Sequence, residues 1–377
     1  MKIGFASRYD PLDKKSWSGS VHYTYKAICR HYDVDIFGYK WPWWLREWLT
    51  MQKSLNRKFS NKGTAVEFLK AYAKDCSRQL EKQLKQNPVD VLFVSGSPQM
   101  ISYLRSPVPV IFMIDATFKQ LNGYYPYYSN LPAYNVKQGV ELDRLAFQNA
   151  SHCLLTSEWA KASAVNDYQI SADKISVIPF SPNMEESGLT RIVPSLPNVC
   201  RILFLGVEWE RKGGPIVLES FRLLQQMGMN PSLHIIGVVP PVDLSGDKNI
   251  TVIPFLDKNN PAERAEMVKI MEASDILFVP TRAECAGVVF SEASAFGLPS
   301  ISTDTGGVSS IVHEGINGYL LSPEAQAPAY AEKIASIFRK PGRLDALKQS
   351  SLEYYKTQLT WAHWEESFQA IVRKLLP

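Results

Sequence analysis

Residues 281–293 read TRAECAGVVFSEA and follow the apolar run Ile276–Val279 after a single proline. The apolar run predicts a buried strand, and Gly287 predicts the start of a helix that continues to Phe296. The first N–H groups of a helix have no intrahelical acceptor, and the helix dipole is positive there. We therefore expect a diphosphate to bind at the residues around this helix start, which are Ala286, Gly287, Val288 and Val289.

Two glutamates flank this predicted helix start. Glu292 lies one turn into the helix, and its two carboxylate oxygens are suited to accept hydrogen bonds from both hydroxyls of a ribose. Glu284 lies before the helix, where it is expected to bind the hydroxyls of a sugar. A buried carboxylate needs partners of this kind, because burial of an unpaired charge is costly.

Outside this segment, strand-like apolar runs alternate with helical patterns over the whole chain. Several runs are apolar on both faces, as buried parallel strands are. Four prolines (Pro179, Pro182, Pro194 and Pro197) interrupt the alternation, which then restarts at Ile202–Leu205. The pattern predicts an α/β protein with two doubly wound, Rossmann-like domains. Expected bounds are 1–185 for the first domain, 186–197 for a linker, 198–350 for the second domain and 351–377 for C-terminal helices.

Composition agrees with a folded globular protein in two domains. The chain has 377 residues, of which 45% are apolar and 21% are charged. It begins with an apolar strand pattern and shows no signal-peptide pattern, and its five cysteines form no C-x-x-C pair. These features predict a cytoplasmic protein with reduced thiols and no structural metal. Residues 1–85 hold 17 Lys and Arg against 8 Asp and Glu (17 − 8 = +9), which predicts a basic face on the first domain.

A second candidate segment, ERKGGP, spans residues 210–215. Glycines allow a close approach of the backbone to a ligand, Arg211 can grip phosphate oxygens in two places, and Lys212 supplies a point charge. Two cations before a helix start are unfavourable unless an anion joins them. A solvated helix start is the alternative interpretation.

The Glu284-x7-Glu292 spacing, in this context, resembles the signature of retaining glycosyltransferases of family 4, which have the GT-B fold. Other motifs extend the resemblance over nearly the whole chain: a glycine loop at Gly19, a strand-to-helix segment from Gly206 to Gly213, and a later loop with Gly306 and Gly307. Trp361 and the last helix resemble the segment that crosses back to the first domain. One departure is Val207, where the family commonly has an arginine; Arg211 is its expected substitute.

This resemblance implies two Rossmann-like domains that face a central cleft. It also implies a retaining hexosyltransferase that moves a sugar from a UDP- or GDP-sugar to an acceptor hydroxyl, with no cofactor and no obligatory metal. The donor would contact Gly19, Gly206, Gly306 and Gly307 besides the two candidate segments. Glu284, Lys212 and Arg211 would be catalytic, because the two cations offset charge on the departing nucleotide.

Three residues of the first domain are candidates for the acceptor side. Asp115 and Thr117 follow the predicted strand Val108–Ile114, and ligands bind beyond the ends of such strands. Asp115 is expected either to orient the acceptor hydroxyl and accept its proton or to cap the following turn. Ser157 is expected to contact the acceptor or to cap a helix.

The segment YKWPWWLREW, residues 39–48, contains Trp41, Trp43, Trp44 and Trp48, and cations follow it. Indoles and basic residues favour a membrane interface, so contact with a membrane or a lipid-linked acceptor is one interpretation. A carbohydrate groove and ordinary core packing are the others. The inner face of the membrane is a possible location.

The sequence therefore predicts a glycosyltransferase of polysaccharide, glycolipid or other glycoconjugate synthesis that acts on a glycan or lipid-linked acceptor. Two alternatives stay open, a nucleotide-sugar epimerase of the same fold and a non-catalytic protein that binds sugar nucleotides or glycans. Asp33-Val34-Asp35 matches the D-x-D metal motif, but it flanks a predicted strand and is assigned to strand-edge polarity. No motif indicates a nucleic-acid partner.

Overall fold

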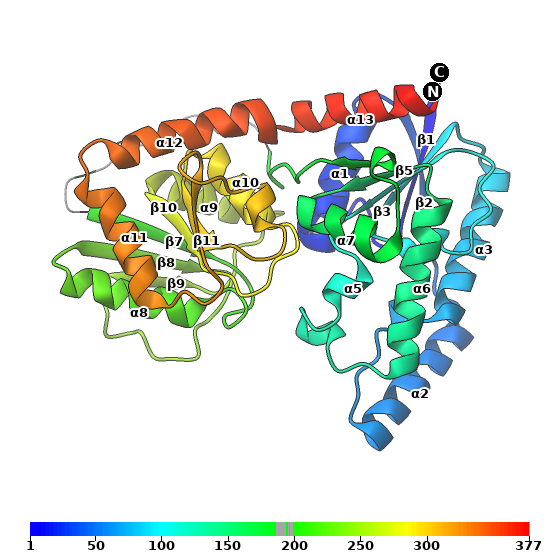
Figure 1. Ribbon diagram of the computed structural model, residues 1–377, viewed down its shortest axis with the longest axis horizontal. Coiled ribbons are helices and arrows are strands. Elements are labelled where there is room, and N and C mark those ends of the chain that lie inside the picture. Colours follow the sequence, from blue (N-terminus) through cyan, green and yellow to red (C-terminus); the bar gives the residue numbers. More distant parts are fainter. Residues whose placement is uncertain (186–193, 195, 197–198, 377) are drawn as a thin grey trace. The chain divides into compact units, whose positions relative to one another are not determined.

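The computed structural model describes residues 1–185, 194, 196 and 199–376. The chain divides into two compact units (Figure 1). The first unit comprises Met1–Pro179 and the end of the chain from Glu365, and the second comprises Phe180–Trp364. Most of the predicted linker, residues 186–197, lies outside the described residues.

In the first unit, six parallel strands form one sheet in the order β2-β1-β3-β4-β5-β6. The strands are β1 (Lys2–Ser7), β2 (Asp33–Gly38), β3 (Val91–Ser95), β4 (Val110–Ile114), β5 (His152–Leu155) and β6 (Ile175–Val177). The α-helices of this unit are α1 (Ser20–Cys29), α2 (Trp43–Ser60), α3 (Lys70–Gln86), α4 (Pro98–Ile101), α5 (Phe118–Leu121), α6 (Ala133–Asn149) and α7 (Glu158–Tyr168). Short 3₁₀ turns cover Ser16–Gly19, Val66–Phe68, Pro126–Tyr128 and Ala172–Lys174.

Helices cover both faces of this first sheet, because successive side chains of a strand point to opposite sides. Phe93 of β3 contacts Phe368 of the last helix, α13 (Trp361–Leu375), on one face. Phe112 of β4 contacts Phe147 of α6 on the other. The strands are therefore apolar on both faces, as the sequence pattern indicated.

The second unit repeats the design with the strand order β12-β11-β10-β7-β8-β9, again all parallel. Its strands are β7 (Val199–Leu205), β8 (Asn230–Ile236), β9 (Ile250–Ile253), β10 (Ile276–Val279), β11 (Ser300–Thr303) and β12 (Gly318–Leu321). Its helices are α8 (Gly214–Gln226), α9 (Pro261–Ala273), α10 (Val288–Ala295), α11 (Ala327–Arg339) and α12 (Arg343–Tyr354), with a 3₁₀ turn at Val308–Ser310.

The predicted fold class, two Rossmann-like α/β domains, is confirmed. Strand β10 has the predicted bounds. Helix α2, which the periodicity analysis did not identify, contains most of the tryptophan-rich segment.

The C-terminal helix reaches the first unit, as predicted. Helix α12 continues into a π-helical turn at Tyr355–Leu359, and α13 follows. Within the first unit, Glu365 of α13 accepts from Arg30 Nη1 at 2.6 Å and pairs with His31 Nε2 at 2.7 Å. These contacts attach the end of the chain to the region that follows α1.

A buried charge network joins two strands of the second sheet to α12. Asp275, directly before β10, is fully buried and binds Arg201 of β7 and Lys348 of α12, each at 2.7 Å. Burial raises the pKa of Asp275, but the hydrogen bonds from Arg201 and the charge of Lys348 outweigh this effect and hold the pKa below its usual range. The network fixes β10 beside β7 at the amino end of both strands.

Candidate functional site

The strand order of the second sheet reverses between β7 and β10. Ile202 of β7 pairs with Ile276 of β10, so the loops that follow these two strands leave the sheet side by side. In open parallel sheets, ligands bind beyond the carboxyl ends of the strands at such a reversal. The two loops are the segments Gly206–Gly213 and Pro280–Gly287, which the sequence singled out as its strongest signals.

Two glycines allow close packing at this position. Gly213 has φ +78°, and a Cβ there would lie 2.1 Å from the carbonyl oxygen of Pro280. A Cβ on Gly206 would lie 2.8 Å from Cγ of Lys212. Larger side chains at either position would therefore displace the second loop or the lysine stem.

Backbone hydrogen bonds hold the two loops together. The carbonyl oxygen of Arg211 accepts from the N–H of Arg282 at 2.7 Å and from Oγ1 of Thr281 at 3.2 Å. The side chain of Arg211 returns across the same gap and donates to the carbonyl oxygen of Ala283 at 2.8 Å. These hydrogen bonds hold the backbones of the two loops in place and so fix the positions from which their side chains extend.

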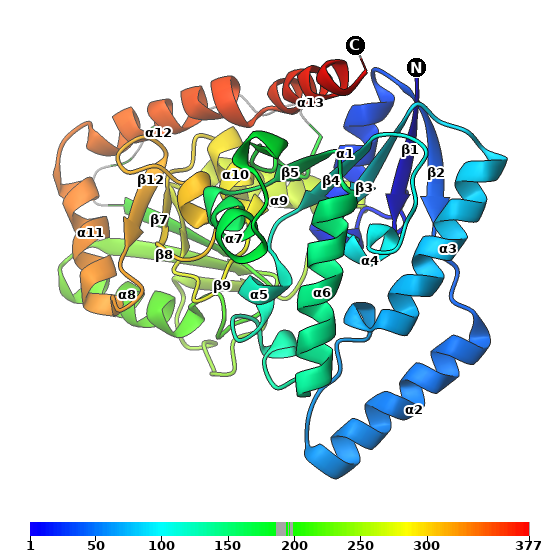
Figure 2. The same cartoon turned by 45° about the vertical axis from the view of Figure 1, so that its right-hand side comes forward.

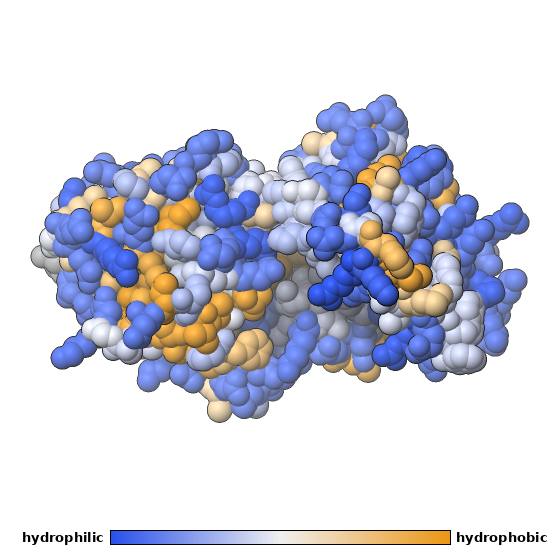
Figure 3. Space-filling model, turned by 90° about the horizontal axis from the view of Figure 1, so that it is seen from below, coloured by the Kyte–Doolittle hydropathy of each residue, from blue (hydrophilic) through white to orange (hydrophobic). Residues whose placement is uncertain are grey.

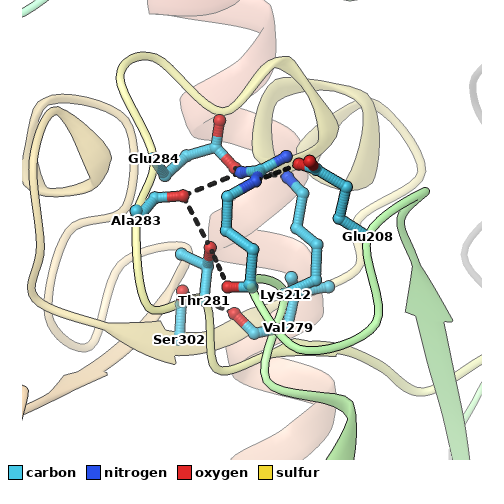
Figure 4. A network of polar contacts seen from close by, with 8 residues as sticks. Glu208, Lys212, Val279, Thr281, Ala283, Glu284 and Ser302 are labelled. Carbon is cyan, nitrogen blue, oxygen red and sulfur yellow. Dashed lines mark hydrogen bonds and ion pairs between the residues drawn. The ribbon is translucent and has the colours of Figure 1, made fainter. Parts of the chain in front are cut away.

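Lys212 and Glu284 form a buried ion pair between these loops (Figure 4). Nζ of Lys212 donates to Oε2 of Glu284, and Nη1 of Arg211 lies 3.5 Å from the same oxygen. Lys212 and Glu284 are each only 8% exposed, and charges buried to this extent require partners. Glu208 pairs with Nε of Arg211 on the outer side. Three of the four predicted catalytic residues, Glu284, Lys212 and Arg211, therefore meet at one point.

The N-terminus of α10 adjoins this cluster through Glu284 and Gly287. Gly287 is the N-cap in the left-handed conformation, with φ +68°, and Val288 and Val289 form the half-buried first turn. The carbonyl oxygen of Glu284 accepts from the N–H of Gly307 at 3.1 Å, which brings the Gly306–Gly307 loop to the same edge. A helix start with a positive dipole thus lies beside two cations, an arrangement suited to a diphosphate.

Glu292 on α10 is 3% exposed and is bound by Nζ of Lys258. Lys258 lies between β9 and α9, beyond the carboxyl edge of the sheet, and the sequence analysis missed it. A single lysine in a polar loop carries no distinctive pattern, so only the folded chain shows it beside Glu292. Glu292 and Lys258 together offer an acceptor and a donor for a polyhydroxy ligand.

The predicted residues of the first unit occupy strand ends and helix starts. Gly19 is the N-cap of α1, with φ +94°. Trp17 and Ser18 before it also have positive φ, 50° and 56°, and such left-handed residues typically cost about 1–3 kcal/mol each. Strain of this kind persists only where surrounding structure enforces it, and the Trp17 ring lies where a Cβ of Gly96 would be.

Asp115 follows β4 and is half-buried. The N-cap of α5 is Thr117, whose side chain accepts from the N–H of Gln120 in a capping box and also contacts Ser163 Oγ at 2.7 Å. Ser157 is the N-cap of α7 and accepts from the N–H of Ala160 at 3.1 Å. Thr117 and Ser157 are fully buried helix caps, so each has a structural role, and their contact with the acceptor stays a prediction.

Asp143 on α6 supports the segment that contains Asp115. Its Oδ2 accepts from the N–H of Phe118, and its Oδ1 is buried and accepts no hydrogen bond within the described part of the chain. Burial raises the pKa of Asp143 to about 7, although the hydrogen bonds from Phe118 and Tyr168 oppose the shift. Sequence reasoning missed this residue, because nothing in its neighbours distinguishes it from an exposed helical aspartate.

The pKa of Asp143 gives a stability that depends on pH. Between about pH 4 and about pH 7, the folded protein holds this proton more firmly than the unfolded chain, so stability from this group falls as pH rises. Asp143→Asn cannot ionise and keeps an oxygen that accepts from Phe118. We therefore expect the Tm of the variant minus the Tm of the wild-type protein to be higher at about pH 8 than at about pH 5. An equal offset at both pH values, measured by scanning fluorimetry, would contradict this role.

Among the described residues, no group of three or more His, Cys, Asp and Glu side chains is arranged to hold a metal ion. In the same part of the chain, every helix is too short or too polar to span a lipid bilayer.

Comparisons with known proteins address the family and the fold. Residues 197–354 match the family described as Glycosyl transferases group 1. A D-inositol 3-phosphate glycosyltransferase 1 of Catenulispora acidiphila is 32% identical over 117 residues, which are 31% of this chain and 27% of the relative. The alignments to the first curated relatives span between 27% and 56% of their length.

Solved structures resemble the chain over almost its full length. A glycosyltransferase from Rickettsia africae has a TM-score of 0.69 at 15% identity and covers 100% of this chain and 98% of its own. Sucrose-phosphate synthase from Thermosynechococcus elongatus has a TM-score of 0.68 at 16% identity, with 99% and 98% covered. The match in the second unit and the likeness in fold lead to one conclusion: residues 197–354 are similar to the glycosyl transferases group 1 family, and the chain has the GT-B fold.

Proposed function

We propose that this protein transfers a sugar from a nucleoside diphosphate sugar to an acceptor hydroxyl with retention of configuration. The observation that supports this most directly is the cluster of Lys212, Arg211 and Glu284 beside the N-terminus of α10. Two cations and a positive helix end at a reversal of strand order suit a diphosphate. The similarity of residues 197–354 to the glycosyl transferases group 1 family supports the reaction class.

In the proposed reaction, the bond from the anomeric carbon to the diphosphate breaks, and a bond to the acceptor oxygen forms. Negative charge builds up on the departing diphosphate, where Lys212, Arg211 and the first amides of α10 stabilise it. Glu284, which pairs with both cations in this structure, then holds hydroxyls of the transferred sugar. Glu292 accepts from the ribose hydroxyls, with Lys258 beside it as a donor.

The nucleobase is proposed to bind the loops that follow β8 and β9. Val239 and Phe255 in these loops are 62% and 57% exposed, and both lie at the carboxyl edge of the sheet. Exposed apolar side chains at a ligand-binding edge offer surface to a flat aromatic base. UDP and GDP are the proposed nucleotides.

Lys212→Ala tests the donor site. Removal of a cation that acts on the leaving diphosphate should lower kcat/KM for the donor at least about tenfold, as loss of single stabilising donors does. Hydrolysis or transfer of UDP- and GDP-sugars is the assay, and Lys340→Ala, which removes an exposed lysine after α11, is the matched control.

A thermal-shift screen with UDP, GDP and ADP identifies the nucleotide first, since a ligand of the folded state raises Tm. Unchanged kinetics in Lys212→Ala with a normal Tm would remove this residue from the site. Incubation with donor alone tests the epimerase alternative, because an epimerised donor in the absence of acceptor would support it.

Asp115 is proposed to orient the acceptor hydroxyl and to accept its proton. The carboxylate follows a strand end in the first unit, while the capping of α5 is carried out by Thr117. Asp115→Asn keeps the shape but removes the proton acceptor, so we expect kcat to fall about 100-fold, within the usual range for general bases, with donor KM nearly constant. Near-normal turnover in a transfer assay would instead assign Asp115 a structural role.

We further propose that the protein works in the cytoplasm at the inner face of the membrane, held there by α2. This helix lies at one end of the first unit in both cartoon views (Figures 1 and 2). Leu45 and Leu49 point into the core, and Asn56 binds Tyr134 of α6. Five of the remaining apolar side chains form an exposed stripe at helical spacing, which consists of Trp44, Trp48, Met51, Leu55 and Phe59, and Trp43 is exposed outside it.

The charge of α2 favours an anionic membrane. Trp43 and Phe59 are 78% and 77% exposed, which is unusual for side chains of this size. Arg57 and Lys58 accompany the stripe near the end of the helix. On the half of the surface in Figure 3 that the first unit forms, hydrophobic residues (orange and tan) lie beside strongly hydrophilic ones (dark blue). Apolar side chains flanked by cations suit the interface of an anionic bilayer.

Liposome sedimentation tests this proposal. The wild-type protein should bind phosphatidylglycerol vesicles, and Trp44→Ala/Phe59→Ala should bind them at least about tenfold more weakly, because both side chains enter the interface. Leu12→Ala, which removes an exposed apolar side chain elsewhere in this unit, is the control. Absence of wild-type binding to anionic vesicles would refute membrane contact through α2.

A further inference from the structure

A cavity of ≈ 420 Å³ lies within the first unit, on the side of α2 away from the apolar stripe. Arg46 and Lys53 of α2 line it together with Arg8 after β1, Glu67, Trp41 and Tyr127. Its volume falls in the range of small-molecule sites, roughly 300–1,000 Å³. We call this cavity the α2 pocket. A carbohydrate groove was one interpretation of residues 39–48, which include Trp41 and Arg46. The other lining residues were not predicted, because the lining comes from four separate segments.

The lining of the α2 pocket carries an excess of positive charge. Three of its side chains, Arg8, Arg46 and Lys53, are cations, whereas Glu67 is its one carboxylate. Glu67 already accepts from Tyr127 Oη at 3.2 Å and lies 4.0 Å from Arg8. Within the described residues, the structure gives Arg46 and Lys53 no ion pair. Like charges around one cavity repel each other, and an anion between them would relieve this repulsion.

Arg8 adds a second observation that points to a ligand. Its Nε is buried and has no hydrogen-bond partner among the described residues, while its guanidinium stacks on the Tyr9 ring at 4.5 Å. A buried donor without an acceptor is costly, and donors to charged groups more so. A phosphate can accept two parallel hydrogen bonds from a guanidinium.

Aromatic side chains complete the lining beside these cations. Trp41 is 44% exposed and Tyr127 is 54% exposed, although both belong to a cavity wall. Trp41 is held in place by Tyr72, with ring centroids 4.6 Å apart. Fixed aromatic faces next to cations offer an apolar surface to the carbon ring of a ligand whose anionic group binds the cations.

We propose that the α2 pocket binds a phosphorylated sugar or polyol as the acceptor of the reaction. A phosphate monoester carries about −1.5 to −2 charges at neutral pH, which matches the excess of two cations over the lining carboxylate. The ring of the same molecule packs on Trp41 and Tyr127 and carries the hydroxyl that receives the sugar. The acceptor role rests on the proposed glycosyl transfer, whereas the phosphate site rests on the pocket alone.

Calorimetric titration with glucose 6-phosphate tests the pocket, with glucose as the uncharged probe. The wild-type protein should bind glucose 6-phosphate more tightly than glucose. Arg46→Gln/Lys53→Gln should weaken this binding about tenfold or more, because both charge-assisted contacts are lost. Lys82→Gln/Lys85→Gln, which removes the same charge from exposed positions of α3, is the matched control and should stay within about twofold.

Two results would overturn the proposal. One is no detectable binding of glucose 6-phosphate, glycerol 3-phosphate or inorganic phosphate to the wild-type protein. The other is equal affinity in Arg46→Gln/Lys53→Gln and the wild-type protein, which would place the phosphate elsewhere. A normal Tm of the variant excludes misfolding as the cause of lost binding.

Vesicles distinguish a free ligand from a lipid headgroup. A headgroup site would make the wild-type protein prefer phosphatidylinositol to phosphatidylglycerol vesicles of equal charge, and Arg46→Gln/Lys53→Gln would lose that preference. Equal binding to both kinds of vesicle assigns the pocket to a free phosphorylated molecule.

The thermal shift with UDP or GDP separates this inference from the proposed function. A nucleotide shift without binding of glucose 6-phosphate, glycerol 3-phosphate or inorganic phosphate would refute the pocket and leave the glycosyl transfer standing. Glucose 6-phosphate binding without any nucleotide shift would refute the transfer and leave a phosphate site of another purpose.

Discussion

The parallel pairing of β7 with β10 is the constraint on which the candidate site depends. The strand order of the second sheet reverses there, so the loops after both strands emerge at the same place with no helix between them. Gly213 lets the loops touch, and the carbonyl oxygen of Arg211 ties them together. Residues more than 70 positions apart in the sequence thereby become neighbours, as Lys212 and Glu284 do.

Each buried carboxylate discussed for the second unit is paired with a cation, but one such pair is structural and the others belong to the candidate site. Asp275, Glu284 and Glu292 are almost inaccessible to water, and each is paired with a cation, since unpaired burial would be too costly. Asp275 lies before β10 and joins strands to a helix. Glu284 and Glu292 lie beyond the carboxyl ends of strands, where a bound ligand can exchange partners with them. Position along the strand, rather than residue type, separates a structural ion pair from a candidate functional one.

The first unit has a different charge balance and different candidate surfaces. Its excess of basic residues is concentrated in part on α2, whose two sides differ in composition. One side carries Trp44, Trp48 and Phe59 toward solvent, and the other contributes Arg46 and Lys53 to the α2 pocket. A helix of 3.6 residues per turn separates these sets although they alternate in the sequence. A membrane interface and an anionic acceptor would thus use opposite sides of one element.

The sequence by itself determined the fold class and the donor-side candidates. Buried parallel strands read as apolar runs, and Gly287 with Glu284 and Glu292 forms a local pattern that spans one loop and one helix. The tertiary structure alone decided which distant residues complete these groups. Lys258 binds Glu292, Asp143 binds Phe118, and Arg8 lies across a cavity from α2. The partners in each case are too far apart in the sequence for a local hydrophobic pattern to connect them. Local sequence patterns indicate backbone conformation and burial. The partner of a buried charge depends instead on how distant segments pack together, and a short segment does not contain that information.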